Sequence, residues 1–141
     1  MNDLTNSGFR LVYNYAYSHV TTTAEILNVT SQCTSSTIIC VGGNRYDETV
    51  LRLVACANCI NATRQTILNV PAYYGGAYWY FTDGLSFGFS PNYTINQYPA
   101  DYFDHSSNLR LSWHLQGSDG WRLGNALWLS NETFYKKIYL N

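Results

Sequence analysis

The sequence predicts an all-β fold, an antiparallel β-sandwich that is jelly-roll-like, with about nine or ten strands and no substantial helix. Three observations support this class. Apolar residues recur at every second position along most of the chain, and nowhere at helical spacing for three turns. The chain has thirteen tyrosines, six phenylalanines and four tryptophans, which favour pleated, half-buried surfaces. Frequent turn signals separate the alternating runs, as is typical of a sandwich.

The expected strands begin with a long one at 9–19, where aromatic or apolar residues hold most odd positions. Strands at 37–41 and 50–56 enclose a longer loop that contains two glycines. A short strand at 66–70 ends at Pro71, since proline cannot donate to a β-ladder. The remaining expected strands are 78–82, 85–89, 109–115, 121–123, 127–129 and 134–140.

The hairpin at 78–89 has the clearest local signal. Its two strands flank Asp83-Gly84, a two-residue turn that supplies positive φ angles and matches the twist of the strands. A second turn is expected at 117–120, which reads Gly-Ser-Asp-Gly. The long connection at 91–108 favours a jelly-roll order over an up-and-down meander.

Length and charge limit the possible partners. The chain has 141 residues, which predicts a single domain, 1–141, with 1–23 as an N-terminal extension or donor strand. Only 12% of the residues are charged, against roughly 25% in an average soluble domain, and the net charge is −1. We therefore expect no nucleic-acid partner. The long uncharged run at 65–82 is interrupted by proline and glycine, so no membrane span is expected.

Four clustered cysteines, Cys33, Cys40, Cys56 and Cys59, indicate two disulfide bonds made in an oxidising compartment. Zinc is disfavoured because six residues separate the first two cysteines, whereas structural zinc ligands usually come in closer pairs. Local pairing of Cys33 with Cys40 and of Cys56 with Cys59 is slightly preferred. The alternative is a nested arrangement, Cys33 with Cys59 and Cys40 with Cys56, which would staple one hairpin across its strands.

Four Asn-x-Thr sequons without proline also indicate an extracellular protein. Combined with the paired cysteines and only two lysines, they favour a secreted glycoprotein in which glycans supply the solubility that charges do not. We therefore expect N-linked glycans and no cofactor. The N-terminus has no basic segment followed by an apolar one, so no signal peptide is visible there. The expected glycosylation sites are Asn28, Asn61, Asn92 and Asn131.

Acid–base side chains are few, and Asp101, Asp104, His105 and Ser106 form their densest cluster. The cluster could serve catalysis, or its two aspartates could bind calcium. Sequence neighbours rarely form a catalytic triad, however, because adjacent strand residues face opposite sides, and loop Asp and Ser usually cap turns. We therefore expect no enzymatic activity, no catalytic residue and no metal site.

The four tryptophans, Trp79, Trp113, Trp121 and Trp128, are candidates for flat platforms on which sugar rings could stack. The core is the favoured location for most of them, and for Trp113 above all, because it lies on a cleanly alternating apolar face.

The N-terminal strand follows a polar octapeptide and suggests a role in assembly. It could pair within its own sheet or fill a groove in a neighbouring subunit. Donation in trans is a heterologous contact that propagates, so it would produce a head-to-tail homopolymer. The expected polymer-interface residues are Phe9, Leu11, Tyr13, Tyr15 and Tyr17.

Three segments, Ala-Cys-Ala-Asn-Cys at 55–59, Gly-Trp-Arg-Leu-Gly at 120–124 and Tyr-Lys-Lys-Ile-Tyr at 135–139, resemble segments of extracellular glycoprotein fibril subunits. In those proteins a jelly-roll body is completed by an N-terminal strand from the neighbouring subunit, and the surface carries many glycans. The resemblance implies donor positions within 9–20 and glycans on the four sequon asparagines.

The interpretation that follows is a structural subunit of an extracellular glycosylated filament, with itself as partner. The subunit would self-assemble by N-terminal strand donation to its neighbour. The alternative is a secreted, carbohydrate-binding, lectin-like β-sandwich module.

Overall fold

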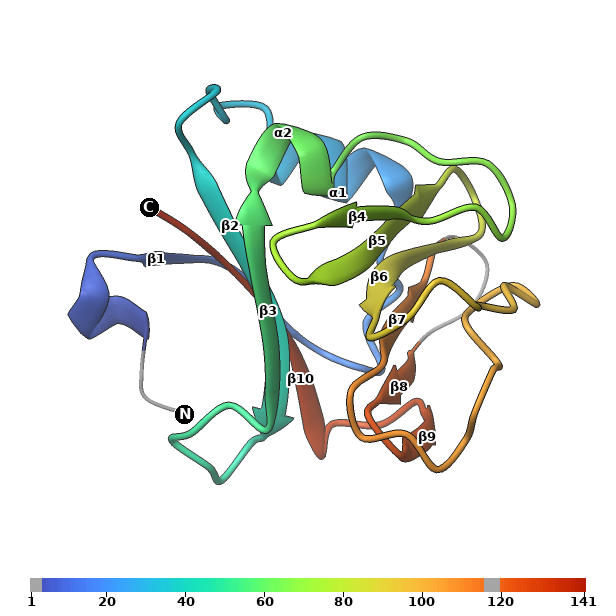
Figure 1. Cartoon of the computed structure of the whole chain (residues 1–141). Coiled ribbons are helices and arrows are strands. Elements are labelled where there is room, and N and C mark those ends of the chain that lie inside the picture. Colours follow the sequence, from blue (N-terminus) through green and yellow to red (C-terminus); the bar gives the residue numbers. More distant parts are fainter. Residues whose placement is uncertain (1–3, 116–119) are drawn as a thin grey trace.

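Two antiparallel sheets packed face to face make up the computed structural model, which describes residues 4–115 and 120–141 (Figure 1). The described residues form ten strands and only short helices, which confirms the predicted all-β sandwich. Most of the turn predicted at 117–120 lies outside the described residues.

The four-stranded sheet has the order β1–β10–β2–β3. The last strand of the chain therefore lies between the first and the second, and it is antiparallel to both. Its strands are β1 (Arg10–Ala16), β2 (Ile38–Arg45), β3 (Leu53–Asn58) and β10 (Phe134–Leu140).

The six-stranded sheet follows the order of the chain, β4–β5–β6–β7–β8–β9, as a meander. The long connection, from which we expected a jelly-roll crossing, joins the neighbouring strands β6 and β7 instead. The strand predicted at 66–70 is absent, because Asn69 turns the chain with φ at 61°. The strands are β4 (Ala72–Tyr74), β5 (Ala77–Thr82), β6 (Ser86–Ser90), β7 (Leu111–His114), β8 (Trp121–Leu123) and β9 (Ala126–Leu129).

Three short helices accompany the sheets: η1 (Leu4–Ser7), α1 (Thr23–Val29) and α2 (Cys59–Ala62). Helices α1 and α2 lie at the same end of the sandwich (Figure 1). Helix α1 begins after Thr22, whose Oγ1 accepts a hydrogen bond from the backbone N–H of Glu25 (3.1 Å). The sequence Thr-x-x-Glu is a helix-start signal, and this signal, unlike periodicity, could have revealed the helix.

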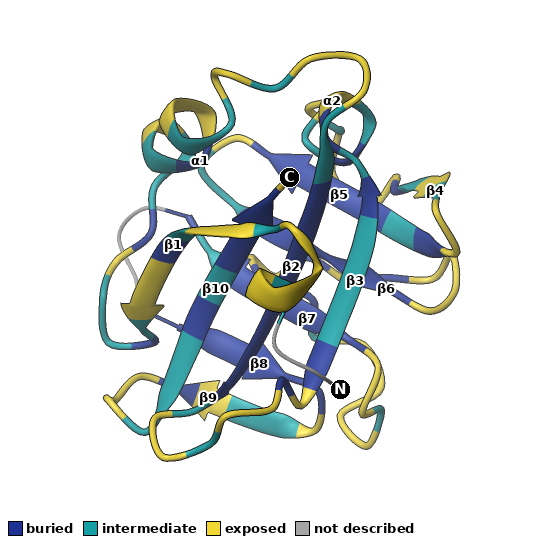
Figure 2. Ribbon diagram, turned by 90° about the vertical axis from the view of Figure 1, so that its left-hand side faces the viewer, coloured by how far each residue is buried: buried dark blue, intermediate teal, exposed yellow. Residues whose placement is uncertain are grey.

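Aromatic side chains of the six-stranded sheet fill the space between the sheets. Trp79, Phe81, Phe87 and Trp113 are buried there, and the predicted core position of Trp113 is confirmed. Figure 2 shows the buried residues concentrated along the central strands. The hairpin around Asp83-Gly84 is confirmed, but its loop has three residues, 83–85, because Thr82 pairs with Ser86, and within this loop Gly84 has the positive φ (68°).

The disulfides are nested, Cys33–Cys59 and Cys40–Cys56, so the preferred local pairing was wrong. The register of β2 against β3 places Cys40 directly opposite Cys56, with their Cα atoms 4.1 Å apart. The same pairing brings the chain before β2 close to the residue after β3, where Cys33 meets Cys59. Strand pairing, and not closeness in sequence, therefore determines the partners.

Replacing both Cys40 and Cys56 by alanine is expected to lower the free energy of unfolding by about 3 kcal/mol, because the bond closes a loop of 16 residues in the unfolded chain. Denaturant unfolding measures this loss of free energy. Replacing Cys33 and Cys59 by alanine should lower the free energy of unfolding slightly more, because that bond closes a longer loop. Non-reducing peptide mapping of the wild type supplies the check. A peptide linking Cys33 to Cys40 would contradict the nested arrangement.

Candidate functional site

Strand β1 forms an edge of the four-stranded sheet, and among the described strands it pairs only with β10 of the same chain. The pairing continues beyond the strand, because the N–H of Tyr17 donates to the carbonyl of Phe134 (2.9 Å). Ahead of β1, helix η1 lies over the outer face of this sheet, as the two views together show (Figures 1 and 2). The N-terminal strand is therefore at the periphery of the fold.

A bulge in β1 divides the five expected interface residues between two faces. Leu11 lies opposite Tyr139 and Tyr13 lies opposite Ile138, so β1 carries one extra residue between these pairs. Before the bulge, Phe9 packs with Tyr139 on the outer face. After it, Tyr13 and Tyr17 are buried between the sheets. The expectation of one continuous apolar face was therefore wrong.

Tyr13 belongs to a polar cluster at the end of β1. Its hydroxyl donates to Glu25 Oε2 (3.0 Å) and is hydrogen-bonded to Thr21 Oγ1 (2.8 Å). Burial raises the pKa of the Tyr13 phenol well above its ordinary value, so the hydroxyl keeps its proton. Lys136 of β10 donates from Nζ to Thr21 Oγ1 (2.8 Å) and to the carbonyl of His19 (2.7 Å). These bonds attach the segment after β1 to the body.

Tyr15 covers this cluster from the solvent side. Its ring stacks on that of His19, with centroids 4.0 Å apart and planes inclined by 17°. The centroid of the Tyr15 ring also lies 4.8 Å from that of Tyr13. Tyr15 itself is exposed. The exposed Tyr15 and the half-buried His19 therefore mark the surface where β1 turns towards α1.

A second polar cluster lies under the connection between β6 and β7, on the outer face of the six-stranded sheet. Asp101, Arg110 and Arg122 are fully buried there. Arg110 Nη1 donates to Asp101 Oδ2 (2.9 Å), and Asp101 Oδ1 accepts the backbone N–H groups of Asn96 and Phe103 (3.0 Å each). Both oxygens of the carboxylate thus have protein partners, which leaves it poorly suited to bind calcium.

Arg122 holds the same connection through main-chain carbonyls. Its guanidinium donates to the carbonyls of Phe103 (2.8 Å), Asp104 (2.8 Å) and Gly124 (2.9 Å). Burial lowers the pKa of Arg122, and the nearby charge of Asp101 opposes this shift. The hydrogen bonds of Arg110 and Arg122 therefore hold the connection between β6 and β7 in its conformation.

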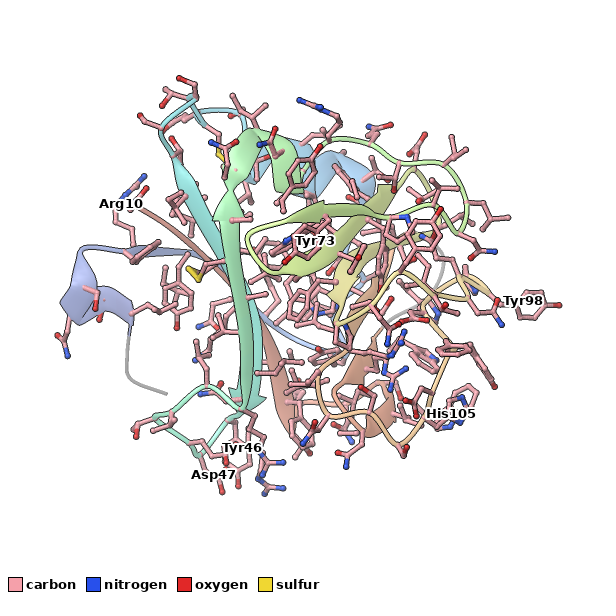
Figure 3. All side chains as sticks on the ribbon, in the orientation of Figure 1. Arg10, Tyr46, Asp47, Tyr73, Tyr98 and His105 are labelled. Carbon is pink, nitrogen blue, oxygen red and sulfur yellow. A yellow bond between two sulfur atoms is a disulfide. The ribbon has the colours of Figure 1, made fainter. Side chains whose placement is uncertain are left out.

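The structure does not bring the four candidate acid–base residues together, although Asp104 and Ser106 are in contact. Asp101 points inwards to Arg110, whereas His105 lies at the periphery (Figure 3). Ser106 Oγ donates to Asp104 Oδ1 (2.8 Å), which is turn capping and not nucleophile activation. In the described ranges, no group of three or more His, Cys, Asp or Glu side chains is arranged to hold a metal ion.

Four aromatic rings gather beside this connection. Tyr102 stacks on Trp121, with centroids 5.1 Å apart and planes inclined by 29°. Trp128 of β9 meets both rings edge to face, each at 5.3 Å. His105 contacts Tyr102 at 4.9 Å. Trp121 is buried and Trp128 is exposed, so this aromatic cluster (Tyr102, His105, Trp121 and Trp128) extends from the interior to the surface.

The four sequon asparagines lie on different parts of the molecule. Asn28 is exposed in α1, and Asn61 is half-buried in α2. Asn92 and Asn131 are exposed in loops. Asn92 also has a structural contact, because its Oδ1 accepts a hydrogen bond from Arg110 Nη2 (2.8 Å). The side chains are thus placed where glycans could be attached, and glycosylation itself stays a prediction.

No family model, curated protein or solved structure matches this chain. No helix in the described part combines the length and the apolar character needed to cross a membrane.

Replacing Asp101 by asparagine is expected to lower the free energy of unfolding by about 3–5 kcal/mol, because it leaves the buried guanidinium group of Arg110 without its ion-pair partner. Asp47→Ala is the matched control. It removes an exposed ion pair with Arg45, far from the cluster (Figure 3), and should change stability little. Equal losses in the two variants, measured by denaturant unfolding, would contradict the structural role of Asp101.

Two variants separate the glycan on Asn92 from the contact of its side chain. Thr94→Ala and Asn92→Ala both remove the sequon, so each should reduce the mass of the secreted protein by the same glycan. Only Asn92→Ala removes the acceptor of Arg110, and it should cost about 1–3 kcal/mol more in unfolding free energy than Thr94→Ala. No mass change in either variant would show that Asn92 carries no glycan.

Proposed function

We propose that this chain is a structural subunit of an extracellular, N-glycosylated filament, in which β1 of one copy pairs with β10 of the next. The observation that carries the proposal is the place of β1. It is an N-terminal edge strand, it has one strand neighbour among those described, and Tyr13 is the only buried residue of its seven. Exchange of this strand would therefore withdraw one buried side chain, Tyr13, from the core.

Exchange of β1 between copies would preserve its interactions. The residues that face each other across β1 and β10 within one chain would also meet when the two strands come from different copies. Each copy would give one strand and receive another, so the contact is heterologous and can continue without limit. It would also cover the edge of β10, which would be exposed once β1 had left.

The contacts of Tyr17 limit the segment that can be exchanged. Its hydroxyl donates to the carbonyl of Arg122 (3.0 Å) and accepts a hydrogen bond from Trp113 Nε1 (3.0 Å), so it is anchored in its own body. The donated part therefore ends before Tyr17, and the link between Ala16 and Tyr17 acts as the hinge. Tyr13 would enter the neighbour beside Trp113, whose ring it stacks on at 6.0 Å within one chain.

Two further features support an extracellular location. The two disulfides are compatible with it, since such bonds persist in oxidising compartments. The four sequon asparagines are at least partly exposed, and glycans on them would solubilise a weakly charged surface. We propose no enzymatic activity, because the candidate acid–base side chains serve turn capping and loop bracing.

A cysteine pair across β1 and β10 distinguishes exchange from pairing within one chain. Asn14 lies directly opposite Lys137, so Asn14→Cys with Lys137→Cys can form a disulfide. In a filament with exchanged strands, this bond joins successive copies. We therefore expect a ladder of multimers on a non-reducing denaturing gel of the secreted protein, collapsing to one band on reduction.

Each single cysteine variant is the control for the ladder, because neither has a partner in the designed position. Removing residues 1–16 should abolish the filaments that electron microscopy is expected to show for the wild type. The proposal is wrong if the wild type stays monomeric across concentrations and the double variant runs as a monomer with its bond inside the chain.

A further inference from the structure

Trp128 has a backbone conformation that large side chains rarely adopt. Its φ is 58°, and it lies where the pairing of β9 with β8 shifts register. A left-handed conformation of this kind costs about 1–3 kcal/mol and persists where the surroundings enforce it, often at functional sites. Packing compensates only in part, since 60% of Trp128 is exposed. A strained position that presents an indole ring to solvent indicates a use for the ring itself.

The ring is held firmly on its inner side. Trp121, which is buried, and Tyr102 both support it edge to face, with interplanar angles of 74° and 77°. The centroids of the three rings lie 5.1–5.3 Å apart, so the rings are in contact with one another. They leave no space between them for a quaternary ammonium group, which would need an open aromatic cage. The cluster offers a flat, rigid surface.

Polar groups beside the cluster favour an uncharged ligand. Asp104 precedes His105 and also has a positive φ, 49°. The hydroxyl of Ser106 lowers the pKa of the Asp104 carboxyl, so this group is ionised at neutral pH and can accept hydrogen bonds. Arg122, whose guanidinium carbon lies 5.6 Å from the Trp121 ring centroid, directs its donors to main-chain carbonyls. An anionic ligand would therefore meet a carboxylate and no available guanidinium.

We propose that the aromatic cluster binds the pyranose ring of a neutral, β-linked carbohydrate by stacking on Trp128. Sugars with equatorial hydroxyls present a flat face of C–H groups that fits an indole, and their hydroxyls can donate to Asp104 and bond to His105. Asn131 lies only three residues beyond Trp128, which is at most about 11 Å along an extended chain. The sugar could thus come from a glycan on Asn131 or from a separate carbohydrate. The proposal does not depend on filament formation.

The test is a titration of the secreted protein with neutral β-linked trisaccharides of N-acetylglucosamine, of glucose and of galactose, followed by calorimetry and by saturation-transfer NMR. We expect binding of at least one with a Kd of about 1 mM or below. Trp128→Gly should weaken it about tenfold or more. Glycine tolerates positive φ and creates no sequon, so this variant should keep or raise the melting temperature.

Tyr73→Ala is the matched control, because Tyr73 is also 60% exposed and lies in β4, at the opposite edge of the same sheet (Figure 3). It should bind as the wild type does. The source of the sugar is tested with Thr133→Ala, which removes the Asn131 sequon. Binding only in this variant identifies the Asn131 glycan as the natural occupant, and equal binding in both identifies a separate carbohydrate.

The proposal is overturned if none of the three trisaccharides binds to the wild type or to Thr133→Ala. It is also overturned if Trp128→Gly binds as tightly as the wild type. A fall in the melting temperature of Trp128→Gly with unchanged binding would assign Trp128 a packing role alone.

Discussion

The C-terminal strand β10 holds the four-stranded sheet together, because it pairs with β1 on one side and with β2 on the other. The strand at the end of the chain is therefore needed before the first strand can find a partner. Lys136 of β10 also binds the main chain at His19 and the hydroxyl of Thr21, just beyond β1. The strand that pairs with β1 thus also holds the segment that follows β1.

The buried ion cluster around Asp101 links two surface features that are far apart in sequence. Arg110 binds Asp101 and the side chain of Asn92, a predicted glycosylation site. Arg122 braces the carbonyls of Phe103 and Asp104, next to the aromatic cluster. Desolvation of these charges is costly, and it is offset here because the carboxylate and most guanidinium donors are hydrogen-bonded. One polar layer therefore supports both a candidate glycan site and the proposed sugar platform.

Much of the strand content was predictable, because alternation and turn residues are local signals. The hairpin around Asp83-Gly84 is the clearest case. Helix α1 was missed because a helix of seven residues is too short to establish a periodicity, although its capping residue Thr22 was visible. The candidate sites were less predictable. The sequence named Asp101 and His105 as neighbours, but the fold turns one towards Arg110 and the other towards Tyr102.

The sequence by itself determined where most strands form, that the cysteines are paired and that the surface carries few charges, since these follow from residue type and short-range spacing. The tertiary structure decided which cysteines join, which face each residue of β1 presents and which tryptophan reaches solvent. Those outcomes depend on contacts between distant residues, such as Cys40 with Cys56 and Tyr17 with Trp113. An alternating pattern shows that a strand needs a partner without specifying which strand that partner is.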